Sequence, residues 1–306
     1  MKGLLRALLL VLFVGLLWSL SLSYAAEKKC LVMGLIPAEE PKSMIERYRP
    51  MKEWMEKDMG MCIEMFTAVD YTGVIEAMRA KKVDFAWFGA FSYVLANERA
   101  GAEAFAVGID EKGRTTYRSY LVATQEVAQL LGINRPLEGE NGMKILREKL
   151  EKHKGKFSFA FTDPASTSGY AVPFYYMAKA GMDPKAYFRN VGFVGTHDAA
   201  ELAVFKKTLN IVADNDITYD KLLREGKITK EKNIVIWMSP EIPGPPMAYR
   251  KDLPEKIKEA LRKSITRVPR DVVVGYGKIV GYKLVSDADY ETIKKIKKFI
   301  DTQKSK

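Results

Sequence analysis

The stretch Cys30-Leu31-Val32-Met33-Gly34-Leu35-Ile36 is a short apolar run, and the segment behind it repeats its apolar residues at helical spacing. This pattern predicts a strand over Cys30–Ile36 and an amphipathic helix over Pro41–Met59. The same alternation then repeats twice, in Cys62–Ala68, Gly73–Lys82, Val83–Phe88 and Ala90–Arg99. Strands that alternate with helices are joined by crossover connections and lie parallel, so the sequence predicts an α/β fold.

A second unit of the same kind follows a polar, Lys- and Glu-rich interval that ends in a predicted surface helix, Met143–His153. Its expected elements are Phe157–Thr162, Thr167–Ala180, Val191–Val194, Ala199–Lys206, Leu209–Ala213 and Tyr219–Arg224. Two extended crossings, near Tyr117–Thr124 and Asn233–Arg250, are the predicted hinge. Two terminal helices are expected over Pro254–Thr266 and Ala288–Thr302. Two such units predict two lobes, with ligands bound beyond the carboxyl ends of the strands.

The composition is that of a folded protein of about two domains. The chain has 306 residues, of which 47% are apolar, and this share excludes a disordered chain. With only 2 cysteines and 2 histidines, the chain can form neither a disulfide-framed small protein nor a four-cysteine zinc site. We therefore expect no metal and no cofactor.

The N-terminus predicts export. Residues 1–26 hold no acid, and two basic residues precede the apolar run Ala7–Trp18. Ser23 and Ala25 fit the small-residue rule for signal peptidase, so residues 1–25 are predicted to be a signal peptide, cleaved after Ala25, and the mature chain is predicted to be periplasmic. The alternative is an uncleaved membrane anchor, because Ala7–Ala26 carries no charge.

Export places both cysteines in an oxidising compartment. Cys30 and Cys62 lie near the starts of the first two predicted strands. If those strands are neighbours in register, the two Cα atoms lie ~5–6 Å apart, within disulfide range. The sequence leaves two outcomes open, a Cys30–Cys62 disulfide or two buried thiols.

The most informative stretch for chemistry is Thr162-Asp163-Pro164-Ala165-Ser166-Thr167-Ser168-Gly169. A predicted strand ends at Thr162, and three consecutive hydroxyl residues, Ser166, Thr167 and Ser168, open the next helix. A helix N-terminus offers unpaired N–H groups and about half a positive charge, so hydroxyls there suit a tetrahedral oxyanion. The plainer interpretation is N-capping by Ser166 alone.

Three other turns also place polar side chains at the carboxyl ends of predicted strands. They contribute Tyr71, Tyr93 and His197. Each of these residues taken singly is more typical of packing or capping than of ligand binding. Together with the hydroxyl turn, they predict one donor-rich edge where the strands end.

These motifs resemble a known family. The run Asp163–Tyr170 is similar to the ligand-binding motif of the periplasmic substrate-binding proteins of phosphonate/phosphite ABC transporters. Further matches cover nearly the whole mature chain in the right order and lie in Gly34–Pro37, Asp70–Arg79, Val83–Gly89, His197–Ala199 and Val235–Gly244. The resemblance implies a two-lobed periplasmic-binding-protein (type II) fold with a two-strand hinge. Lobe 1 would comprise residues 26–120 and 240–306, and lobe 2 residues 121–239.

The resemblance also implies a function and its residues. The protein would be a monomer that binds a small phosphorus oxyanion by clamshell closure and delivers it to an ABC permease with its ATPase. Ser166, Thr167 and Ser168 would hold the phosphonate group, with Tyr71, Tyr93 and His197 closing around it. These roles are carried over from the family motif and do not follow from spacing alone.

One departure from the family pattern bears on the ligand. Members that take aminoalkylphosphonates resemble one another in two acids that grip the amine. Those positions align here with Ile217 and Pro245, neither of which can pair with an ammonium group. We therefore expect a ligand without an amine, such as phosphite, phosphate or methylphosphonate. Asp216 is adjacent and could substitute if the alignment slips by one residue.

Three rival functions stay open at this point. A sensory module for the same anions would share every motif. A hydrolase could be drawn from Ser166 or Ser168 with His197 and Asp198, although the chain lacks a Gly-x-Ser-x-Gly turn.

The third rival, a nucleic-acid binder, would rest on the net charge of +11 alone. The last 56 residues hold 15 Lys and Arg against 8 Asp and Glu, so most of the excess lies away from the predicted site. No aromatic residue lies among the four lysines at positions 294–298 of the terminal helix, so we expect no nucleic-acid partner.

Overall fold

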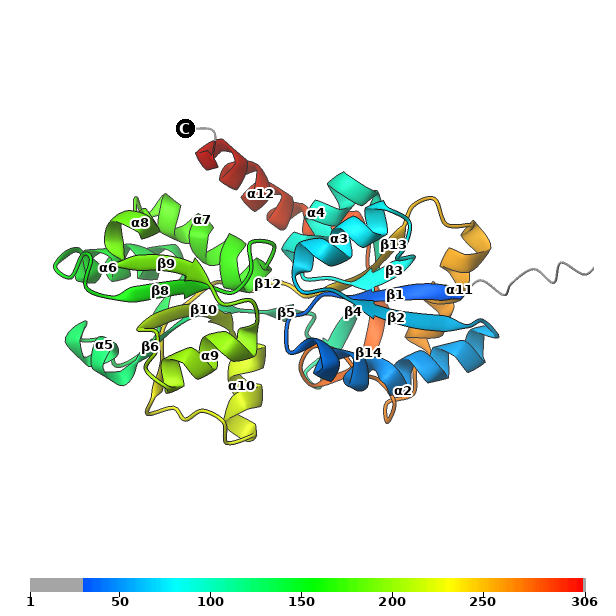
Figure 1. Cartoon of the computed structure of the whole chain (residues 1–306), viewed down its shortest axis with the longest axis horizontal. Helices are drawn as coiled ribbons and strands as arrows, with labels where there is room; N and C mark the ends of the chain where they lie inside the picture. Colours follow the sequence, from blue (N-terminus) through cyan, green and yellow to red (C-terminus); the bar gives the residue numbers. More distant parts are fainter. Residues whose placement is uncertain (1–29, 305–306) are drawn as a thin grey trace, which may run out of the picture.

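The computed structural model describes residues 30–304, and the predicted signal peptide with its cleavage site lies outside them. Two lobes, each built on a six-stranded sheet flanked by helices, are connected by a two-stranded sheet (Figure 1). This arrangement confirms the predicted two-lobed α/β fold. Within residues 30–304, no helix combines the length and the apolar character needed to cross a membrane.

The first lobe contains a mixed sheet with the strand order β14-β4-β13-β3-β1-β2. Strands β1 and β2 are parallel with Leu31 opposite Ile63, and β3 continues the parallel set on the other side of β1. The elements of this lobe are β1 (Leu31–Leu35), α2 (Pro41–Met59), β2 (Ile63–Thr67), α3 (Tyr71–Arg79), β3 (Phe85–Trp87), α4 (Ala90–Ala100), β4 (Ala102–Asp110), β13 (Pro246–Arg250), α11 (Glu255–Thr266), β14 (Ile279–Leu284), a 3-10 turn (Asp287–Tyr290) and α12 (Glu291–Lys304).

The second lobe contains a sheet with the order β7-β11-β6-β10-β8-β9. Strands β8, β9 and β10 are parallel, whereas β6 runs antiparallel to both of its neighbours. The elements are β6 (Ser119–Thr124), α5 (Gln125–Leu130), β7 (Leu137–Glu138), α6 (Gly139–Glu151), β8 (Ser158–Phe161), a π-helical turn (Thr167–Ala171), α7 (Val172–Lys179), α8 (Pro184–Tyr187), β9 (Asn190–Phe193), α9 (His197–Phe205), β10 (Ile211–Asn215), α10 (Asp216–Arg224) and β11 (Asn233–Met238).

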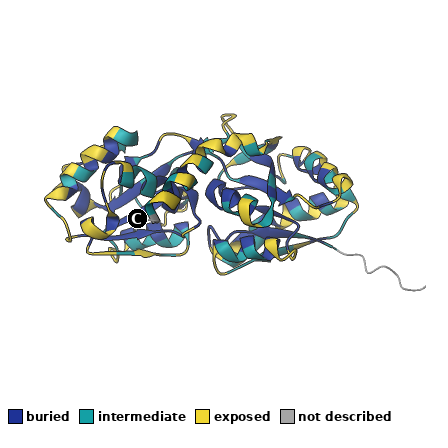
Figure 2. Cartoon of the chain, turned by 90° about the horizontal axis from the view of Figure 1, so that it is seen from above, coloured by how far each residue is buried: buried dark blue, intermediate teal, exposed yellow. Residues whose placement is uncertain are grey.

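The two chain crossings meet in a small sheet between the lobes. Strand β5 (Thr116–Tyr117) pairs antiparallel with β12 (Ile242–Pro243). In Figure 2 the buried residues follow the sheets and the inner faces of the helices, and the exposed residues lie on the outer helix faces. The carboxyl ends of the parallel strands of both lobes point toward the junction, which is where the polar turns come together.

Two contacts tie distant parts of the chain together. Cys30 and Cys62 form a disulfide with a Cα–Cα distance of 4.6 Å. Of the two alternatives that the sequence left open, a disulfide or two buried thiols, the structure shows the disulfide. The C-terminal helix α12 packs on α4 of the first lobe and also reaches α7 of the second, where the Phe299 and Tyr175 rings lie 5.0 Å apart (Figure 1).

Candidate functional site

The hydroxyl turn after β8 is folded tightly over the end of its strand. The Ser166 hydroxyl accepts a hydrogen bond from the Gly169 backbone N–H at 3.0 Å, and the Thr162 N–H donates to the Gly169 carbonyl. A Cβ added at Gly169 would lie 2.2 Å from the Thr162 hydroxyl oxygen, so only glycine fits there. The plain capping role of Ser166 is therefore real, and all three hydroxyl residues are also buried at the junction of the lobes.

His197 opens helix α9 and faces this turn. Its Nε2 lies 3.5 Å from the Ser166 hydroxyl oxygen, and its Nδ1 lies 2.5 Å from Oδ1 of Asp214 at the end of β10. The imidazole is 3% exposed, and burial lowers the pKa of His197 to about 4, so the ring is neutral at pH 7. The acid paired with the imidazole is Asp214, because Asp198 instead binds Lys221.

Tyr71 brings the first lobe into the same cluster. Its hydroxyl is buried and has no hydrogen-bond partner among the described residues. The nearby Ser166 hydroxyl lowers the pKa of Tyr71 slightly. Burial still raises the pKa of Tyr71 well above its usual value, so the phenol is a neutral donor. A buried donor without a partner is uncommon in folded proteins and is available for a ligand.

Tyr93 does not join this cluster. Its hydroxyl donates to Asp287 at 2.8 Å and accepts from the Ala104 backbone N–H at 3.2 Å, inside the first lobe. The tyrosine that contacts the hydroxyl turn is Tyr117, on the hinge strand β5, whose hydroxyl interacts with those of Thr167 and Ser168. Burial raises the pKa of Tyr117 to about 12.

Tyr276 also lies in this cluster, although it was not predicted as a site residue. Its hydroxyl lies 3.0 Å from the Asn215 side-chain nitrogen and contacts the Thr218 hydroxyl. Tyr117 had a sequence indication, because it begins one of the two predicted crossings. Tyr276 lies between two glycines outside the predicted elements and had no such indication.

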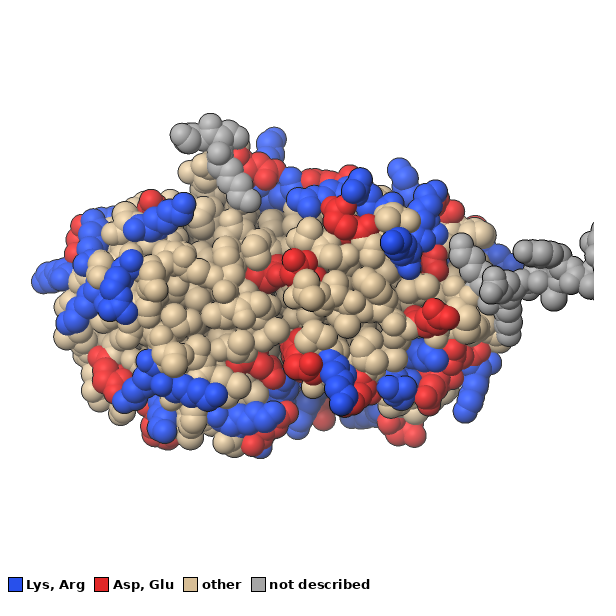
Figure 3. Space-filling view, viewed as in Figure 1, with Lys and Arg blue, Asp and Glu red and all other residues tan. Residues whose placement is uncertain are grey.

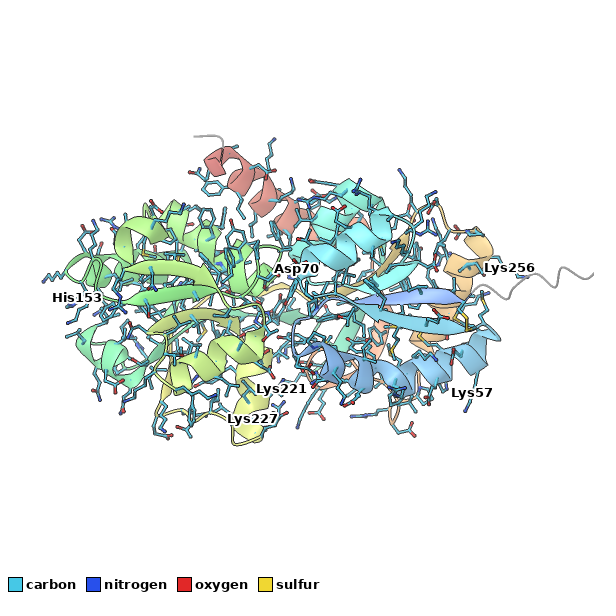
Figure 4. All side chains as sticks on the ribbon, in the orientation of Figure 1. Lys57, Asp70, His153, Lys221, Lys227 and Lys256 are labelled. Atoms are coloured by element: carbon cyan, nitrogen blue, oxygen red, sulfur yellow. A yellow bond between two sulfur atoms is a disulfide. The ribbon has the colours of Figure 1, made fainter. Side chains whose placement is uncertain are left out.

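The two lobes touch directly around the cluster. The Phe91 backbone N–H donates to the Thr167 hydroxyl oxygen at 2.8 Å, and the His197 N–H donates to the Ala38 carbonyl at 3.0 Å. Lys221 on α10 forms an ion pair across the junction with Glu39 at 3.1 Å. Figure 4 shows Lys221 where the lobes face each other and His153 at the outer end of the second lobe. The described conformation is therefore a closed one.

A cleft of about 340 Å³ adjoins the cluster between the lobes. Its walls include Tyr117 and Tyr276 as well as Ile217 and Pro245, the two positions that we expected to align with the amine-binding acids. Asp216 also lines the cleft, and burial raises its pKa to about 6, with Asp220 as a further cause. Among residues 30–304, no cluster of three or more His, Cys, Asp or Glu side chains could hold a metal ion.

Comparison with known proteins decides the family. Residues 33–290 match the family model described as ABC transporter, phosphonate, periplasmic substrate-binding protein. The chain belongs to this family. The family comprises substrate-binding transport proteins, so membership implies export, a small ligand, and an ABC permease with its ATPase as partner. The expected function class is thereby confirmed.

Individual relatives agree with this assignment. The chain is 32% identical to the phosphonates-binding periplasmic protein of Escherichia coli, over 87% of this chain and 72% of that protein. It is 28% identical to the phosphate-import protein PhnD of Mycolicibacterium smegmatis, over 76% and 70%. Among solved structures, a binding protein of an ABC phosphonate transporter from Pseudomonas aeruginosa superposes with a TM-score of 0.76 at 26% identity, covering 89% and 87% of the chains.

A second solved structure supports the fold alone, because its sequence identity is low. PhnD1 from Prochlorococcus marinus, determined in complex with methylphosphonate, superposes with a TM-score of 0.75 at 19% identity, over 90% of this chain and 99% of that one.

Proposed function

We propose that this protein binds a small phosphorus oxyanion without an amino group, such as phosphite, phosphate or methylphosphonate, between its lobes. The binding residues would be Ser166, Thr167 and Ser168 of the second lobe with His197, and Tyr71 of the first lobe. Tyr117 takes the role first expected of Tyr93. The observation that carries the proposal is the buried Tyr71 hydroxyl, which has no partner among the described residues and lies beside the hydroxyl turn.

Such a site can supply the binding free energy of a micromolar complex with an anion without a cationic side chain. Hydrogen bonds to a charged group contribute about 1.5–3 kcal/mol each. Five of them amount to about 7.5–15 kcal/mol, and the upper part of this range exceeds the roughly 8 kcal/mol of a micromolar complex even after ordering losses. A neutral site also fits the surface, since Lys and Arg gather toward the edges of the face in Figure 3 and its middle is largely uncharged.

The lack of an amine on the ligand is supported by the cleft beside the cluster. Ile217 and Pro245 form part of its wall, and neither offers a charge to an ammonium group. Four acids also line this cleft, namely Asp110, Glu111, Asp216 and Asp220. Asp216 is adjacent to Ile217, and its carboxylate already accepts from the Arg118 backbone N–H at 3.1 Å. We therefore keep the amine-free ligand as the proposal.

The proposal extends to how the protein works. Residues 26–120 with 240–306 and residues 121–239 would move as two rigid lobes about the β5–β12 hinge, and closure would exclude water from the anion. The protein would act as a monomer, released from its signal peptide after Ala25 and delivering the anion to the permease.

Calorimetry with phosphate, phosphite, hypophosphite, methylphosphonate and 2-aminoethylphosphonate tests the proposal. We expect micromolar or tighter binding of at least one amine-free anion and weaker binding of 2-aminoethylphosphonate. The double variant Ser166→Ala, Thr167→Ala should lose at least about tenfold in affinity, the effect of one charge-assisted bond. Thr208→Ala, at an exposed position of the same lobe, is the matched control.

Three results would count against the proposal. Unchanged affinity in the double variant would place the anion elsewhere. Tightest binding of the amine-bearing compound would contradict the argument from Ile217 and Pro245. Release of product from a phosphoester, followed by phosphorus NMR, would support the hydrolase alternative.

A further inference from the structure

Three buried polar side chains form a row behind the hydroxyl turn. His197 and Glu201 lie four residues apart on α9 and therefore share one face of that helix. Asp214, on the neighbouring strand β10, contacts both of them. Glu201 and Asp214 are both 0% exposed.

From the contacts of the two carboxyl groups we infer that they share a proton. Glu201 Oε2 accepts from the Asn233 amide at 2.6 Å, and Asp214 Oδ1 faces His197. The other oxygens, Glu201 Oε1 and Asp214 Oδ2, are buried with no donor among the described residues, although the two carboxyl groups interact. A proton held between the two groups supplies the missing donor, and two adjacent buried carboxylates could not both stay ionised.

The proton belongs to Glu201 and the charge to Asp214. Asn215 directs its amide N–H groups to Asp214 Oδ1 at 3.2 Å and to the Tyr276 hydroxyl, because its own oxygen accepts from the Thr218 backbone N–H. Burial raises the pKa of Asp214 as well, but hydrogen bonds from Glu201 and Asn215 lower it and so favour the ionised form. Burial and the neighbouring Asp214 both raise the pKa of Glu201 well above its usual value.

This arrangement fixes the hydrogen of the imidazole. Two groups face His197 Nδ1, namely Asp214 Oδ1 at 2.5 Å and the Asn215 amide nitrogen at 3.0 Å. We infer the ring hydrogen from the shorter contact, in which Nδ1 donates to an ionised Asp214 and Nε2 carries a lone pair. Nε2 is the atom that lies 3.5 Å from the Ser166 hydroxyl oxygen, at the proposed anion site. A lone pair repels an oxyanion unless the oxyanion itself brings a hydrogen.

We propose that the site selects phosphorus oxyanions that keep one acidic hydrogen, whose P–OH group donates to His197 Nε2. Glu201 is the positioning residue that, through Asp214, imposes this requirement. The inference rests on the proposed function and specifies its ligand as a singly protonated anion, such as the monoanion of phosphite or of methylphosphonate.

The charges around the imidazole also disfavour a second negative charge on the ligand. Three acids and one base face His197 besides Asp214, namely Asp198, Glu39, Asp163 and Lys221. Lys221 binds both Glu39 and Asp198, which leaves negative charge in excess. Glu201 faces Asp214, Asp198, Asn233 and Tyr219, so no base adjoins it to take its proton.

The first experiment measures how affinity depends on pH. Calorimetry of the wild-type protein with methylphosphonate from pH 6 to 9 should give a constant affinity at low pH, then a fall of about tenfold per pH unit once the ligand loses its second proton. Hypophosphite carries no acidic hydrogen at these pH values, so it should bind much more weakly than methylphosphonate at pH 6 and change little up to pH 9. A flat profile for methylphosphonate, or hypophosphite binding as tight as that of methylphosphonate at pH 6, would overturn the inference. Failure of both anions to bind at any pH would instead contradict the proposed function.

The second experiment observes the imidazole directly. Because the chain has only 2 histidines, nitrogen-15 NMR can resolve His197, using a His153→Gln variant for assignment. We expect a proton on Nδ1 and none on Nε2 in the ligand-free protein. A hydrogen on Nε2 would overturn the inference without any binding measurement.

Substitutions test the two acids. In Asp214→Asn, the new amide oxygen should face Glu201 and the new amide N–H should face His197 Nδ1. The ring hydrogen should then move to Nε2. As a result, the affinity for methylphosphonate should no longer fall above pH 7. Glu201→Ala should weaken methylphosphonate binding about tenfold at pH 7, and Glu201→Gln should restore most of it, since its amide N–H donates to Asp214 as the protonated acid does. Gln behaving like Ala, or Asp214→Asn keeping the wild-type profile, would refute the role of the pair. Circular dichroism establishes that each variant is folded.

Discussion

Thr167 makes a contact that exists only when the lobes are closed. Its hydroxyl oxygen accepts from the Phe91 backbone N–H at 2.8 Å, across the junction, and both residues are buried. The replacement Thr167→Val keeps the shape of the side chain and removes the acceptor. In an open form the Phe91 N–H can bond to water, so the substitution penalises the closed form alone.

The size of the effect follows from that asymmetry. A buried N–H left without an acceptor costs about 1–3 kcal/mol. Because ligand binding requires closure, this free energy appears in full in the dissociation constant and weakens binding about 5- to 150-fold. A bond from the same hydroxyl to the anion would add to the loss. Thr167→Ser keeps the hydroxyl and is the matched control, with an affinity expected within about threefold of wild type.

Calorimetry with phosphite and methylphosphonate measures the loss, and small-angle X-ray scattering measures closure. Thr167→Val should bind both anions more weakly by a similar factor and should need more ligand to reach the compact form. The ligand-free variant should melt within about 2 °C of wild type, because no contact inside a lobe is lost. An affinity within twofold of wild type would refute the reasoning that the Thr167–Phe91 bond stabilises the closed form.

Three further predictions concern stability and local packing. Replacing both Cys30 and Cys62 by Ser removes a cross-link between residues 32 positions apart. By the loop-entropy relation, this should lower the free energy of unfolding by about 3.7 kcal/mol and the melting temperature by on the order of 10 °C. Ligand affinity should be retained, because the disulfide lies at the strand ends away from the cleft. Gly169→Ala drives a Cβ into the Thr162 side chain and should abolish binding and destabilise the second lobe by about 1–3 kcal/mol in urea unfolding, whereas Gly192→Ala, where a Cβ meets nothing, should do neither. Glu201→Gln should raise the melting temperature at pH 7 but not at pH 4. The pKa of Glu201 is raised in the folded protein, so the folded wild type keeps a proton that the unfolded chain releases above about pH 4.3. Above that pH the wild type loses stability, and Gln, which does not titrate, avoids this loss.

The sequence predicted the parallel part of each sheet better than the antiparallel additions. Helix α2 begins and ends where the periodicity placed it. Strands β4 and β14 were not predicted. In β4, Glu103 and Gly108 interrupt an otherwise apolar run, and in β14 only Tyr282 is buried. Their pairing with each other and with β13 depends on contacts distant in the sequence, which local patterns do not carry.

The residues of the site also fall into two groups, those that local sequence patterns predicted and those that only the packing of distant elements brings together. The three hydroxyls are contiguous in the sequence, and their turn was predicted from local rules. Tyr93 was predicted to bind because its turn follows a parallel strand, yet its side chain turns into its own lobe. Glu201 and Asp214 carried no local indication, since Glu201 sits in the middle of an ordinary helix. Only the packing of α9 on β10 brings their carboxyl groups together.

The net charge of the chain cannot explain how such a protein chooses its ligand. Sulfate is a tetrahedral dianion of similar size, and any attraction due to the charge of +11 acts on it as strongly as on a phosphorus oxyanion. A hydrogen-bond acceptor aimed at the anion does discriminate, because sulfate has no hydrogen to give at neutral pH and would leave His197 Nε2 opposed to a bare oxygen. Sites built to bond a hydroxyl reject analogues that lack it by factors of about 10⁴–10⁵. The buried Glu201–Asp214 pair therefore provides selectivity that hydroxyls and helix N-termini, which bind any oxyanion, do not.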